Sequence, residues 1–498
     1  MKPVRKTGNF DAHKSESQVW YAAFKRKDTR FDGRFFVGVA STGIYCRPVC
    51  RARLPKFENC TFYDTAAEAE HAGFRPCLLC RPELAPGSAP VDATAHLVHQ
   101  AAKLIEQNCA YGESLEGIGE RLGYSARHLR RAFLEEFHVS PVQYLQTSRL
   151  LLAKNLLTNT NLSVLDVAMA AGFGSLRRFN DLFRKRYRLT PTALRSEVAG
   201  AGRQDGEITV ALGYRPPYLW QQMLDFLALR AIPGVEVIKD GEYLRTAHFV
   251  TGDRRDAYGW VRVGHQPRNN TLSVTVEVAL LPVLPQVLAS VRHLFDLCCD
   301  PNAVHEALAS MNEIKPNLCV LGTRLPGCFN VFEMAVRAVL GQQITIKAAR
   351  TLAGRFVNAY GTPVQTGVEG LTHVFPSPGG IVALRGSIEN HLGPLGITGV
   401  RAKAIWGLAQ ALVRGDVDFK FCAQPEEEVQ KLMALPGIGA WTAQYIAMRA
   451  MGWPDAFPDT DYGVKKALAP RTAKEISTMA ANWRPWRSYA TINLWNSL

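Results

Sequence analysis

Four cysteines near the start of the chain are spaced like the ligands of a metal ion. Three residues separate Cys46 from Cys50, and two separate Cys77 from Cys80. Two such pairs within one small domain can place four thiolates around one tetrahedral zinc ion. The chain contains 11 cysteines, but it is too long for the disulfide scaffolds of small secreted proteins. We therefore predict one Zn²⁺ bound by Cys46, Cys50, Cys77 and Cys80, and no organic cofactor.

A second stretch whose residues could bind a ligand is the sequence Leu-Pro-Gly-Ile-Gly-Ala-Trp at positions 435–441. Gly437 and Gly439 predict a tight turn, because glycine adopts conformations that let backbone amides approach an anion closely. Apolar residues from Trp441 to Met451 recur at helical spacing, so the turn opens a helix whose positive N-terminus also favours an anion. DNA phosphate is the obvious anion, and such a contact grips the backbone without reading sequence.

The segment between these two sites contains an internal repeat. Residues 114–124 are matched by residues 163–173, and each unit is typical of a helix-turn-helix with a basic second helix. We predict recognition helices at 125–137 and 174–187, with a structural helical bundle as the alternative. The pair resembles the AraC-type transcription regulator domain, which implies two units that read successive major grooves. The candidate DNA contacts are Arg127, Arg130, Arg131, Arg177 and Arg178.

Length and composition limit the number of domains and the kinds of partner that we expect. A length of 498 residues predicts three or four domains. The net charge of +14 favours a polyanionic partner such as nucleic acid, although charge also serves solubility. The sequence contains neither a secretory leader nor an uninterrupted apolar run of about 18 residues. We therefore expect a cytoplasmic protein that does not span a membrane.

The surroundings of the four cysteines resemble a known repair domain. The stretches 31–39, 43–48 and 73–77 are similar to the N-terminal domain of Ada-type methylphosphotriester repair proteins. This resemblance implies that Cys46 irreversibly accepts a methyl group from a DNA phosphotriester. The chemistry is sound, because zinc keeps cysteine as the nucleophilic thiolate. Methylation would also reduce the negative charge that repels DNA, and would thus act as an electrostatic switch.

The zinc site and its neighbouring arginines each have a simpler interpretation. A purely structural zinc site without methyl transfer would have the same cysteine spacing. Arg47, Arg51 and Arg53 are candidate phosphate contacts, but a solvated basic face explains them nearly as well.

The C-terminal half resembles DNA base-excision glycosylases. The glycine hairpin and a later Asp461 are similar to the helix-hairpin-helix superfamily, and the likeness to the AlkA type of 3-methyladenine DNA glycosylase extends from about Tyr214 to the end. It includes the stretches 327–329, 340–343, 458–462 and 483–489, and Trp495. The resemblance implies that Asp461 is the catalytic carboxylate, which stabilises the oxocarbenium-like sugar and orients or deprotonates water. Asp459 is the competing assignment, and a helix N-cap is the structural alternative for either residue.

The expected substrate pocket is aromatic. Cation–π stacking would favour a positively charged alkylated base after that base is flipped out of the duplex. The resemblance places Trp441, Tyr445, Tyr462, Trp495 and Gln342 in this pocket, although aromatic residues are often simply core.

Further positions are carried over from the same resemblance. Trp441 stands where strand-cleaving relatives carry a Schiff-base lysine, so excision without strand cleavage is expected. Gly437, Gly439 and Gln343 are expected to contact DNA, with the polar Gln343 in place of an apolar wedge.

Together these patterns predict a multidomain α+β protein with a small zinc domain, an all-α double helix-turn-helix, a mixed α/β domain and an all-α helix-hairpin-helix domain. The predicted boundaries are 1–86, 92–198, 207–320 and 321–498, with small-residue linkers at 82–90 and 199–206. The predicted function is monofunctional excision of alkylated purines, of the 3-methyladenine type, fused to a methylphosphotriester-sensing transcription regulator. The alternative is a regulator whose glycosylase half is a non-catalytic DNA clamp. Expected partners are double-stranded, alkylated and promoter DNA and RNA polymerase, with the protein a monomer.

Overall fold

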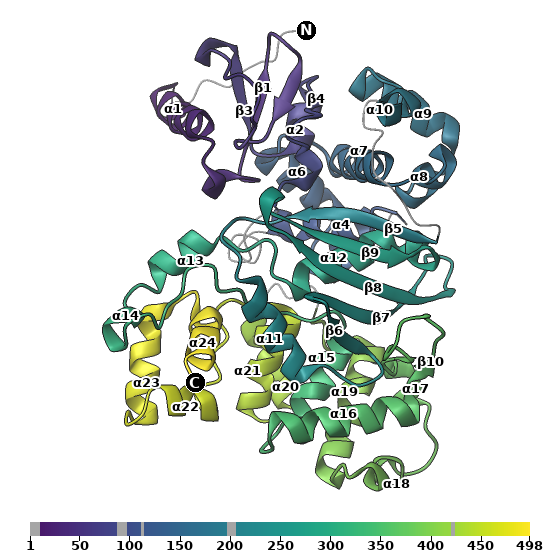
Figure 1. Cartoon of the computed structure of the whole chain (residues 1–498), viewed down its shortest axis with the longest axis vertical. Coiled ribbons are helices and arrows are strands. Elements are labelled where there is room, and N and C mark those ends of the chain that lie inside the picture. Colours follow the sequence, from purple (N-terminus) through teal and green to yellow (C-terminus); the bar gives the residue numbers. More distant parts are fainter. Residues whose placement is uncertain (1–9, 87–96, 111–113, 197–205, 420–423) are drawn as a thin grey trace.

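The computed structural model of the chain describes residues 10–86, 97–110, 114–196, 206–419 and 424–498. The N-terminal parts lie at one end of the long axis, a five-stranded sheet lies in the middle, and most of the C-terminal helices lie at the other end (Figure 1). Within the described ranges, no helix is both long enough and apolar enough to cross a membrane.

The first part is built on a four-stranded sheet with the order β3-β1-β2-β4. Strand β1 (Phe36–Val39) pairs antiparallel with β2 (Ile44–Cys46) and β3 (Cys60–Tyr63), and β4 (Arg75–Pro76) joins β2 in parallel. The remaining elements are α1 (Phe10–Arg26), η1 (Thr29–Phe31), η2 (Phe57–Asn59), α2 (Ala66–His71) and η3 (Pro82–Leu84). Because Tyr45 faces Pro76 across the parallel pair, the next residues along, Cys46 and Cys77, leave the sheet side by side.

The helices that follow contain the repeat expected from the sequence. They are α4 (Leu97–Gln107), α5 (Leu115–Leu122), α6 (Ala126–Glu136), α7 (Pro141–Asn159), α8 (Val164–Ala170), α9 (Leu176–Tyr187) and α10 (Pro191–Ser196). Ser125 and Ser175 cap α6 and α9, each by accepting a hydrogen bond from the amide three residues on. Gly123 and Gly172, in the two turns, have φ angles of 75° and 85°, a conformation that favours glycine. The second helices of both units therefore form where the basic residues were predicted.

A five-stranded antiparallel sheet with the order β5-β9-β8-β7-β6 forms the middle of the molecule. Its strands are β5 (Glu207–Gly213), β6 (Glu236–Lys239), β7 (Glu242–Val250), β8 (Asp256–Gln266) and β9 (Thr271–Glu277). The accompanying helices are α11 (Trp220–Arg230), η4 (Pro267–Asn269), η5 (Val278–Val283) and α12 (Leu284–Leu294). Alternate residues of β5, namely Ile208, Val210 and Leu212, are buried, as the period of two requires for a sheet covered on one face.

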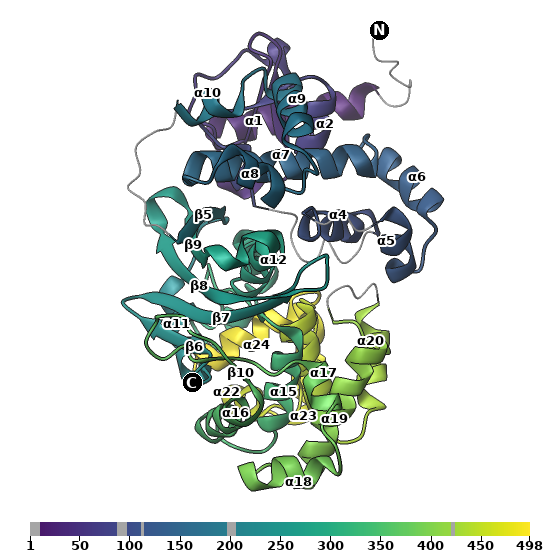
Figure 2. The same ribbon diagram turned by 90° about the vertical axis from the view of Figure 1, so that its right-hand side faces the viewer.

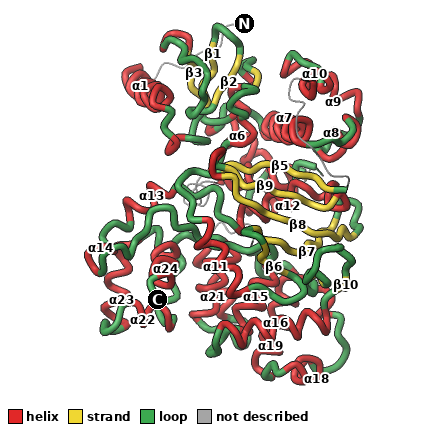
Figure 3. The backbone as a smooth tube through the Cα atoms, viewed as in Figure 1, coloured by secondary structure: helices red, strands yellow, loops and turns green. Residues whose placement is uncertain are grey.

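The C-terminal part is mostly helical, and Figure 3 shows it beside the strands of the sheet. Its elements are α13 (Pro301–Ala307), α14 (Met311–Ile314), α15 (Val331–Leu340), α16 (Ile346–Tyr360), β10 (Thr362–Pro363), β11 (His373–Val374), α17 (Pro378–Val382), α18 (Ile388–Leu392), η6 (Gly393–Leu395), α19 (Gly399–Arg414), α20 (Pro425–Met433), α21 (Ala440–Ile446), the π-helical turn η7 (Ala447–Met451), α22 (Tyr462–Ala467), α23 (Ala473–Ala480), η8 (Ala481–Trp483) and α24 (Arg487–Asn496). Helix α15 is buried along most of its length and packs against α19 and α21, so it supports α21, the helix that follows the glycine hairpin.

The N-terminal parts are docked on the rest of the molecule. The sequence predicts a free linker at 82–90, but residues 82–84 form η3, and Glu83 is buried there. The Glu83 carboxylate accepts a hydrogen bond from Lys154 Nζ of α7 at 2.6 Å. On another face, Arg34 Nη2 lies 2.6 Å from an Asp300 carboxylate oxygen at the start of α13. The second predicted linker, at 199–206, lies almost wholly outside the described residues.

Candidate zinc and glycosylase sites

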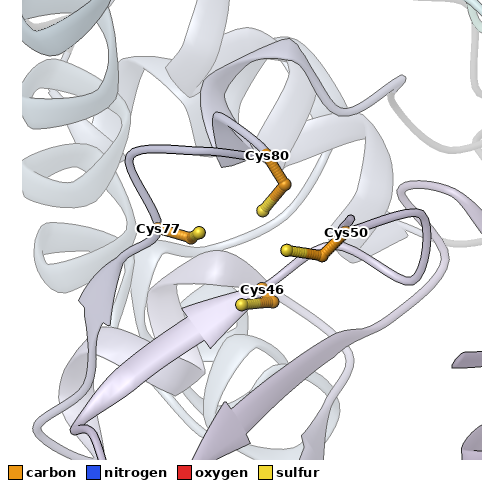
Figure 4. Close-up of side chains that lie close together, drawn as sticks. All are labelled: Cys46, Cys50, Cys77 and Cys80. Atoms are coloured by element: carbon orange, nitrogen blue, oxygen red, sulfur yellow. The ribbon is translucent and has the colours of Figure 1, made fainter. Parts of the chain in front are cut away.

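The four cysteines converge on one point (Figure 4). Cys46 ends β2, Cys50 lies in the turn after it, and Cys77 and Cys80 lie in the turn after β4. Their sulfur atoms all lie within 4.8 Å of one another. Four sulfurs bound to one zinc ion at about 2.3 Å are about 3.8 Å apart. The donor set and its spacing therefore fit Zn²⁺.

One backbone amide contacts a sulfur of the site. The Arg47 amide donates to Cys80 Sγ at 3.4 Å. An N–H donor stabilises the negative charge of a thiolate and so reduces its nucleophilicity, which makes Cys80 a weaker nucleophile.

Arg47 is not the free phosphate contact that the sequence suggests. Its Nε donates to Asp32 Oδ1 at 2.8 Å, its Nη2 donates to the other carboxylate oxygen, and its Nη1 donates to the Cys80 carbonyl oxygen at 3.1 Å. The side chains of Arg47 and Asp32 are only 12% and 6% exposed. Arg51 and Arg53 are exposed, so they remain candidate phosphate contacts.

The candidate DNA contacts of the recognition helices all lie on the surface. The exposed residues are Arg127, Arg130 and Arg131 of α6, and Arg177 and Arg178 of α9. Arg130 lies 3.2 Å from Glu116, but both side chains are more than half exposed, and such a surface pair exchanges readily for phosphate. The far end of α9 is engaged within the protein, because Arg186 Nη1 donates to the Glu70 carbonyl oxygen of α2 at 2.8 Å.

The glycine hairpin between α20 and α21 is exposed and requires glycine at one position. Gly437 has a φ angle of 79°, and a Cβ there would lie 3.0 Å from the Ala404 Cβ and 3.2 Å from the Val400 carbonyl oxygen. Gly439 has a φ angle of −90°, and a Cβ there would meet nothing within 4 Å. The turn therefore depends on Gly437, while Gly439 keeps the surface open beside the N-terminus of α21.

Gln342 holds this hairpin from the turn after α15. Its Nε2 donates to the Gly437 carbonyl oxygen and to Thr442 Oγ1, both at 2.9 Å. Gln342 was predicted in the substrate pocket, but its amide nitrogen faces the hairpin instead. Gln343 is exposed on the same turn, with a φ angle of 53°, so its side chain is available to DNA.

Asp461 lies between two tryptophans. Trp441 Nε1 donates to Asp461 Oδ2 at 2.9 Å, and Trp495 Nε1 donates to Oδ1 at 2.8 Å. The Val464 amide also donates to Oδ1, at 3.0 Å, so Asp461 is the N-cap of α22 as well. A carboxylate oxygen can accept two hydrogen bonds. Oδ1 accepts two and Oδ2 accepts one, which leaves one lone pair on Oδ2 for a further donor such as water. Asp459 is exposed, and its side chain has no hydrogen-bond partner within the described part of the chain.

The predicted aromatic residues group around Asp461, with one exception. The rings of Trp441 and Tyr445 are stacked, with centroids 5.2 Å apart and planes at 16°. The Tyr445 and Trp495 centroids are 6.1 Å apart. Tyr462 is 78% exposed and, among the described residues, its ring packs against no other aromatic ring. The structure thus brings together three of the four aromatic residues expected in the pocket.

The sequence interpretation missed two residues of this group. Phe226, from α11, stacks on Trp495 with centroids 6.4 Å apart and planes at 17°. Arg449 lies over the Phe226 ring at 4.9 Å, and its Nη1 donates to the Tyr445 hydroxyl at 3.0 Å. Arg449 could have been inferred, because it follows Tyr445 by four residues on one helix face. Phe226 belongs to a distant segment, and no local pattern points to it.

The arginines also change the acidity of the tyrosine in this group. Burial raises the pKa of Tyr445, but the positive charges of Arg449 and Arg230 and the Arg449 hydrogen bond outweigh it, so the pKa is lowered. The tyrosine hydroxyl therefore serves as an acceptor for Arg449, which helps to fix the Trp441–Tyr445 stack.

Three segments of the chain match known protein families. Residues 19–83 match the metal binding domain of Ada, residues 118–197 match a helix-turn-helix domain, and residues 209–330 match the AlkA N-terminal domain.

Relatives cover both the whole chain and its separate parts. A Mycobacterium tuberculosis protein, described as a probable bifunctional transcriptional activator/DNA repair enzyme AlkA, is 37% identical over 487 residues, which cover 96% of each chain. DNA-3-methyladenine glycosylase 2 of Escherichia coli is 35% identical over 57% of this chain and 95% of its own length. The bifunctional transcriptional activator/DNA repair enzyme AdaA of Bacillus subtilis is 32% identical over 37% of this chain and 85% of its own.

Proposed function

Because this chain belongs to the family of bifunctional transcriptional activator/DNA repair enzymes of the AlkA type, we propose that it both repairs alkylated DNA and regulates the response to it. Its glycosylase half excises alkylated purines of the 3-methyladenine type. Its N-terminal half takes a methyl group from a DNA phosphotriester and binds promoter DNA through the two helix-turn-helix units.

Base excision is a hydrolysis of the bond between the sugar C1′ and the alkylated base. The alkylated base carries a positive charge, so it leaves as a neutral molecule with the bonding electron pair, and water adds to C1′. Asp461 stabilises the positive charge that develops on the sugar, and Oδ2 accepts a hydrogen bond from the attacking water. The two indole N–H groups hold the carboxylate in one orientation, so no reorganisation is needed when charge develops.

Selection of the charged base falls to the aromatic group. Trp441 and Tyr445 stack on each other and present π faces beside Asp461. A cation on such a face gains about 0.5–2 kcal/mol over a neutral base of the same shape. Position 441 holds tryptophan, so there is no lysine amine here to form an imine, and the product is an abasic site.

Methyl transfer uses the Cys46 thiolate. The zinc ion, held by Cys46, Cys50, Cys77 and Cys80, supplies the stabilisation that keeps the sulfurs deprotonated. The Cys46 sulfur attacks the methyl carbon, an S–C bond forms, and the C–O bond breaks. The phosphate leaves with the electron pair as an ordinary diester anion, so the step needs no proton. The Arg47 amide on Cys80 Sγ makes that sulfur a weaker competitor of Cys46.

The regulatory half works on promoter DNA and with RNA polymerase. Five exposed arginines on α6 and α9 supply the charge for phosphate and base contacts. The DNA-reading unit is already duplicated within one chain, so the protein acts as a monomer.

The single observation that carries the repair function is the Asp461 carboxylate held between Trp441 and Trp495 beside an exposed glycine hairpin. Its test is release of free alkylated bases from methylated duplex DNA by the intact chain, by Asp461→Asn and by Asp459→Asn. We expect release to collapse in Asp461→Asn and to persist in Asp459→Asn. Release that disappears only in Asp459→Asn would reassign the carboxylate, and no release by the intact chain would favour a regulator with a non-catalytic DNA clamp.

A further inference from the structure

The residue after the methyl acceptor bridges the two halves of the zinc site. The Arg47 amide donates to Cys80 Sγ at 3.4 Å, and its Nη1 donates to the Cys80 carbonyl oxygen at 3.1 Å. Arg47 therefore joins the turn of Cys46 and Cys50 to the turn of Cys77 and Cys80 at two points. One of these points is a zinc-binding sulfur itself.

Asp32 fixes the guanidinium that makes this bridge. Both of its carboxylate oxygens accept hydrogen bonds from Arg47, through Nε and Nη2, in the parallel fork that arginine and carboxylate form best. Removal of either partner would leave an uncompensated buried charge.

We propose that the Arg47–Asp32 pair is a positioning device that favours Cys46 over Cys80 as the methyl acceptor. The pair holds the Arg47 amide on Cys80 Sγ, which lowers the nucleophilicity of that sulfur. It also holds the backbone of residue 47, which sets the direction of the Cys46 side chain. If the fork is lost, the amide can leave Cys80, and the sulfurs become more alike in nucleophilicity. The inference rests on the proposed role of Cys46 and adds what selects it.

The test compares which sulfur is methylated in full-length, zinc-loaded protein. The variants are Asp32→Asn, which removes the charge, and Arg47→Lys, which keeps the charge but cannot reach Asp32 and the Cys80 carbonyl together. Each protein is treated with limiting methyl iodide, and the methylated cysteine is identified by peptide mass spectrometry. Zinc content and the rate of zinc transfer to a chelator are measured on the same samples.

The intact protein is expected to carry the methyl group on Cys46. In both variants we expect methylation of Cys46 to slow by about tenfold and methylation of Cys80 to appear, while zinc remains bound. A matched control exists in the same part of the chain, because Arg30 and Asp28 form a similar fork at the surface. Asp28→Asn and Arg30→Gln should leave the methylation pattern unchanged.

Two results would overturn the inference. Methylation of Cys46 alone, at the rate of the intact protein, would show that the pair does not select the acceptor. Loss of zinc from both variants would show that the pair only holds the site together. Failure of the proposed function is separable, because the intact protein would then be methylated on Cys46 by methyl iodide but not by DNA that carries methylphosphotriesters.

Discussion

Asp461 caps a helix and, in the mechanism that we propose, also takes part in catalysis. Its Oδ1 caps α22 through the Val464 amide, while the indoles of Trp441 and Trp495 orient the carboxylate from both sides. Capping and catalysis are often treated as alternatives for an aspartate at a helix start. Here the cap anchors the backbone at Asp461 and the two indoles orient its carboxylate. The same arrangement therefore serves capping and the proposed catalysis.

The indole nitrogen of Trp495 can be removed without removing its ring. In Trp495→Phe the stack with Phe226 is retained, but Asp461 Oδ1 loses one N–H donor. Because a hydrogen bond to a charged group contributes about 1.5 kcal/mol or more, we expect base release to slow by about tenfold with little change in thermal stability. Single-turnover release of alkylated base measures this, with Trp486→Phe as the control, because in the described part of the chain the Trp486 indole makes no hydrogen bond to Asp461. An unchanged rate would show that the indole does not orient the carboxylate.

At the scale of residues, the sequence was informative where chemistry depends on short spacing. The zinc ligands follow from two cysteine pairs, and their convergence is confirmed by the sulfur positions. Phe226 could not be predicted, because it reaches Trp495 from a helix in the preceding part of the chain. The pairing of Arg47 with Asp32 could not be predicted either. The sequence does not distinguish an arginine that faces DNA from one that pairs with a buried carboxylate.

The hairpin between α20 and α21 is the element on which the glycosylase half depends. Gln342 ties it to the end of α15 through the Gly437 carbonyl oxygen and Thr442. The exposed amides of the turn lie at the N-terminus of α21, where a phosphate is favoured by the helix dipole. The position of the turn relative to Asp461 is set by α21, which carries Trp441.

The two glycines of this hairpin provide an internal comparison. Gly437→Ala places a Cβ against Ala404 and Val400 at a positive φ angle, which costs about 1–2 kcal/mol in backbone strain. Gly439→Ala meets open space at an ordinary φ angle. We expect Gly437→Ala to weaken binding of undamaged duplex DNA by about tenfold, and Gly439→Ala to weaken it less. Equal binding by both variants, measured by fluorescence anisotropy, would contradict this account of the turn.

Among the elements, the internal repeat with its glycine turns and basic second helices predicted the two recognition helices to within two residues at their ends. A serine that caps a helix and a glycine that allows a turn both act locally. The helix boundaries that they set can therefore be inferred from the sequence. The expected helix from Trp441 to Met451 is correct only in part, because it passes into a π-helical turn at Ala447. That change depends on packing of Arg449 against distant carbonyls, which no local pattern records.

Buried polar contacts join the zinc part to the DNA reader. Glu83 of the zinc part pairs with Lys154 of α7, and the side chains are 2% and 1% exposed. Arg81 adds a hydrogen bond to Thr158 of the same helix at 3.0 Å. Such buried charges are tolerated only where both partners are present, so the sensor and the DNA reader are docked in one arrangement.

Removing one partner of the buried pair should therefore destabilise the protein. Glu83→Gln leaves the Lys154 ammonium buried without a counter-charge, a change that costs about 3 kcal/mol or more. Glu369→Gln is the matched control, because its pair with Lys239 is 3.9 Å long and its side chain is 94% exposed. Urea unfolding should show a lower midpoint for Glu83→Gln only. Matching midpoints in the two variants would show that the docking is not maintained by this pair.

Glu70 makes the interface between the zinc part and the DNA reader sensitive to pH. It accepts hydrogen bonds from Tyr45 and Thr147, faces Arg186 and Tyr187, and burial raises its pKa from 4.5 to about 7. The folded state thus binds this proton more tightly than the unfolded chain does. The stability it contributes is fully present below pH about 4.5 and is lost as the pH rises to about 7.

Glu70→Gln should remove this pH dependence. The glutamine stays neutral at every pH and can still take part in hydrogen bonds with both hydroxyl groups. Melting temperatures of the intact protein and the variant should therefore diverge across this window, with the intact protein losing more stability as the pH rises. Parallel curves would mean that Glu70 keeps an ordinary pKa in the folded protein.

Contacts of this kind mark the limit of sequence interpretation for the whole molecule. The separate parts could be inferred from composition and motifs, because each has its own local signature. Glu83 and Lys154 are 71 positions apart, and nothing near either residue indicates the other. A linker was predicted at 82–90 because its residues are small and proline-rich. The buried pair of Glu83 and Lys154 instead places residues 82–84 in the interface between the zinc part and the DNA reader.

We propose that one chain carries two independent repair chemistries. The most direct measurement is a single reaction on methylated duplex DNA in which free alkylated bases and the methylation of Cys46 are quantified together, for the intact protein and for Asp461→Asn. We predict that the intact protein performs both reactions and that Asp461→Asn loses base release while Cys46 is still methylated. Base release that persists in Asp461→Asn, or a Cys46 that stays unmodified in the intact protein, would contradict the account.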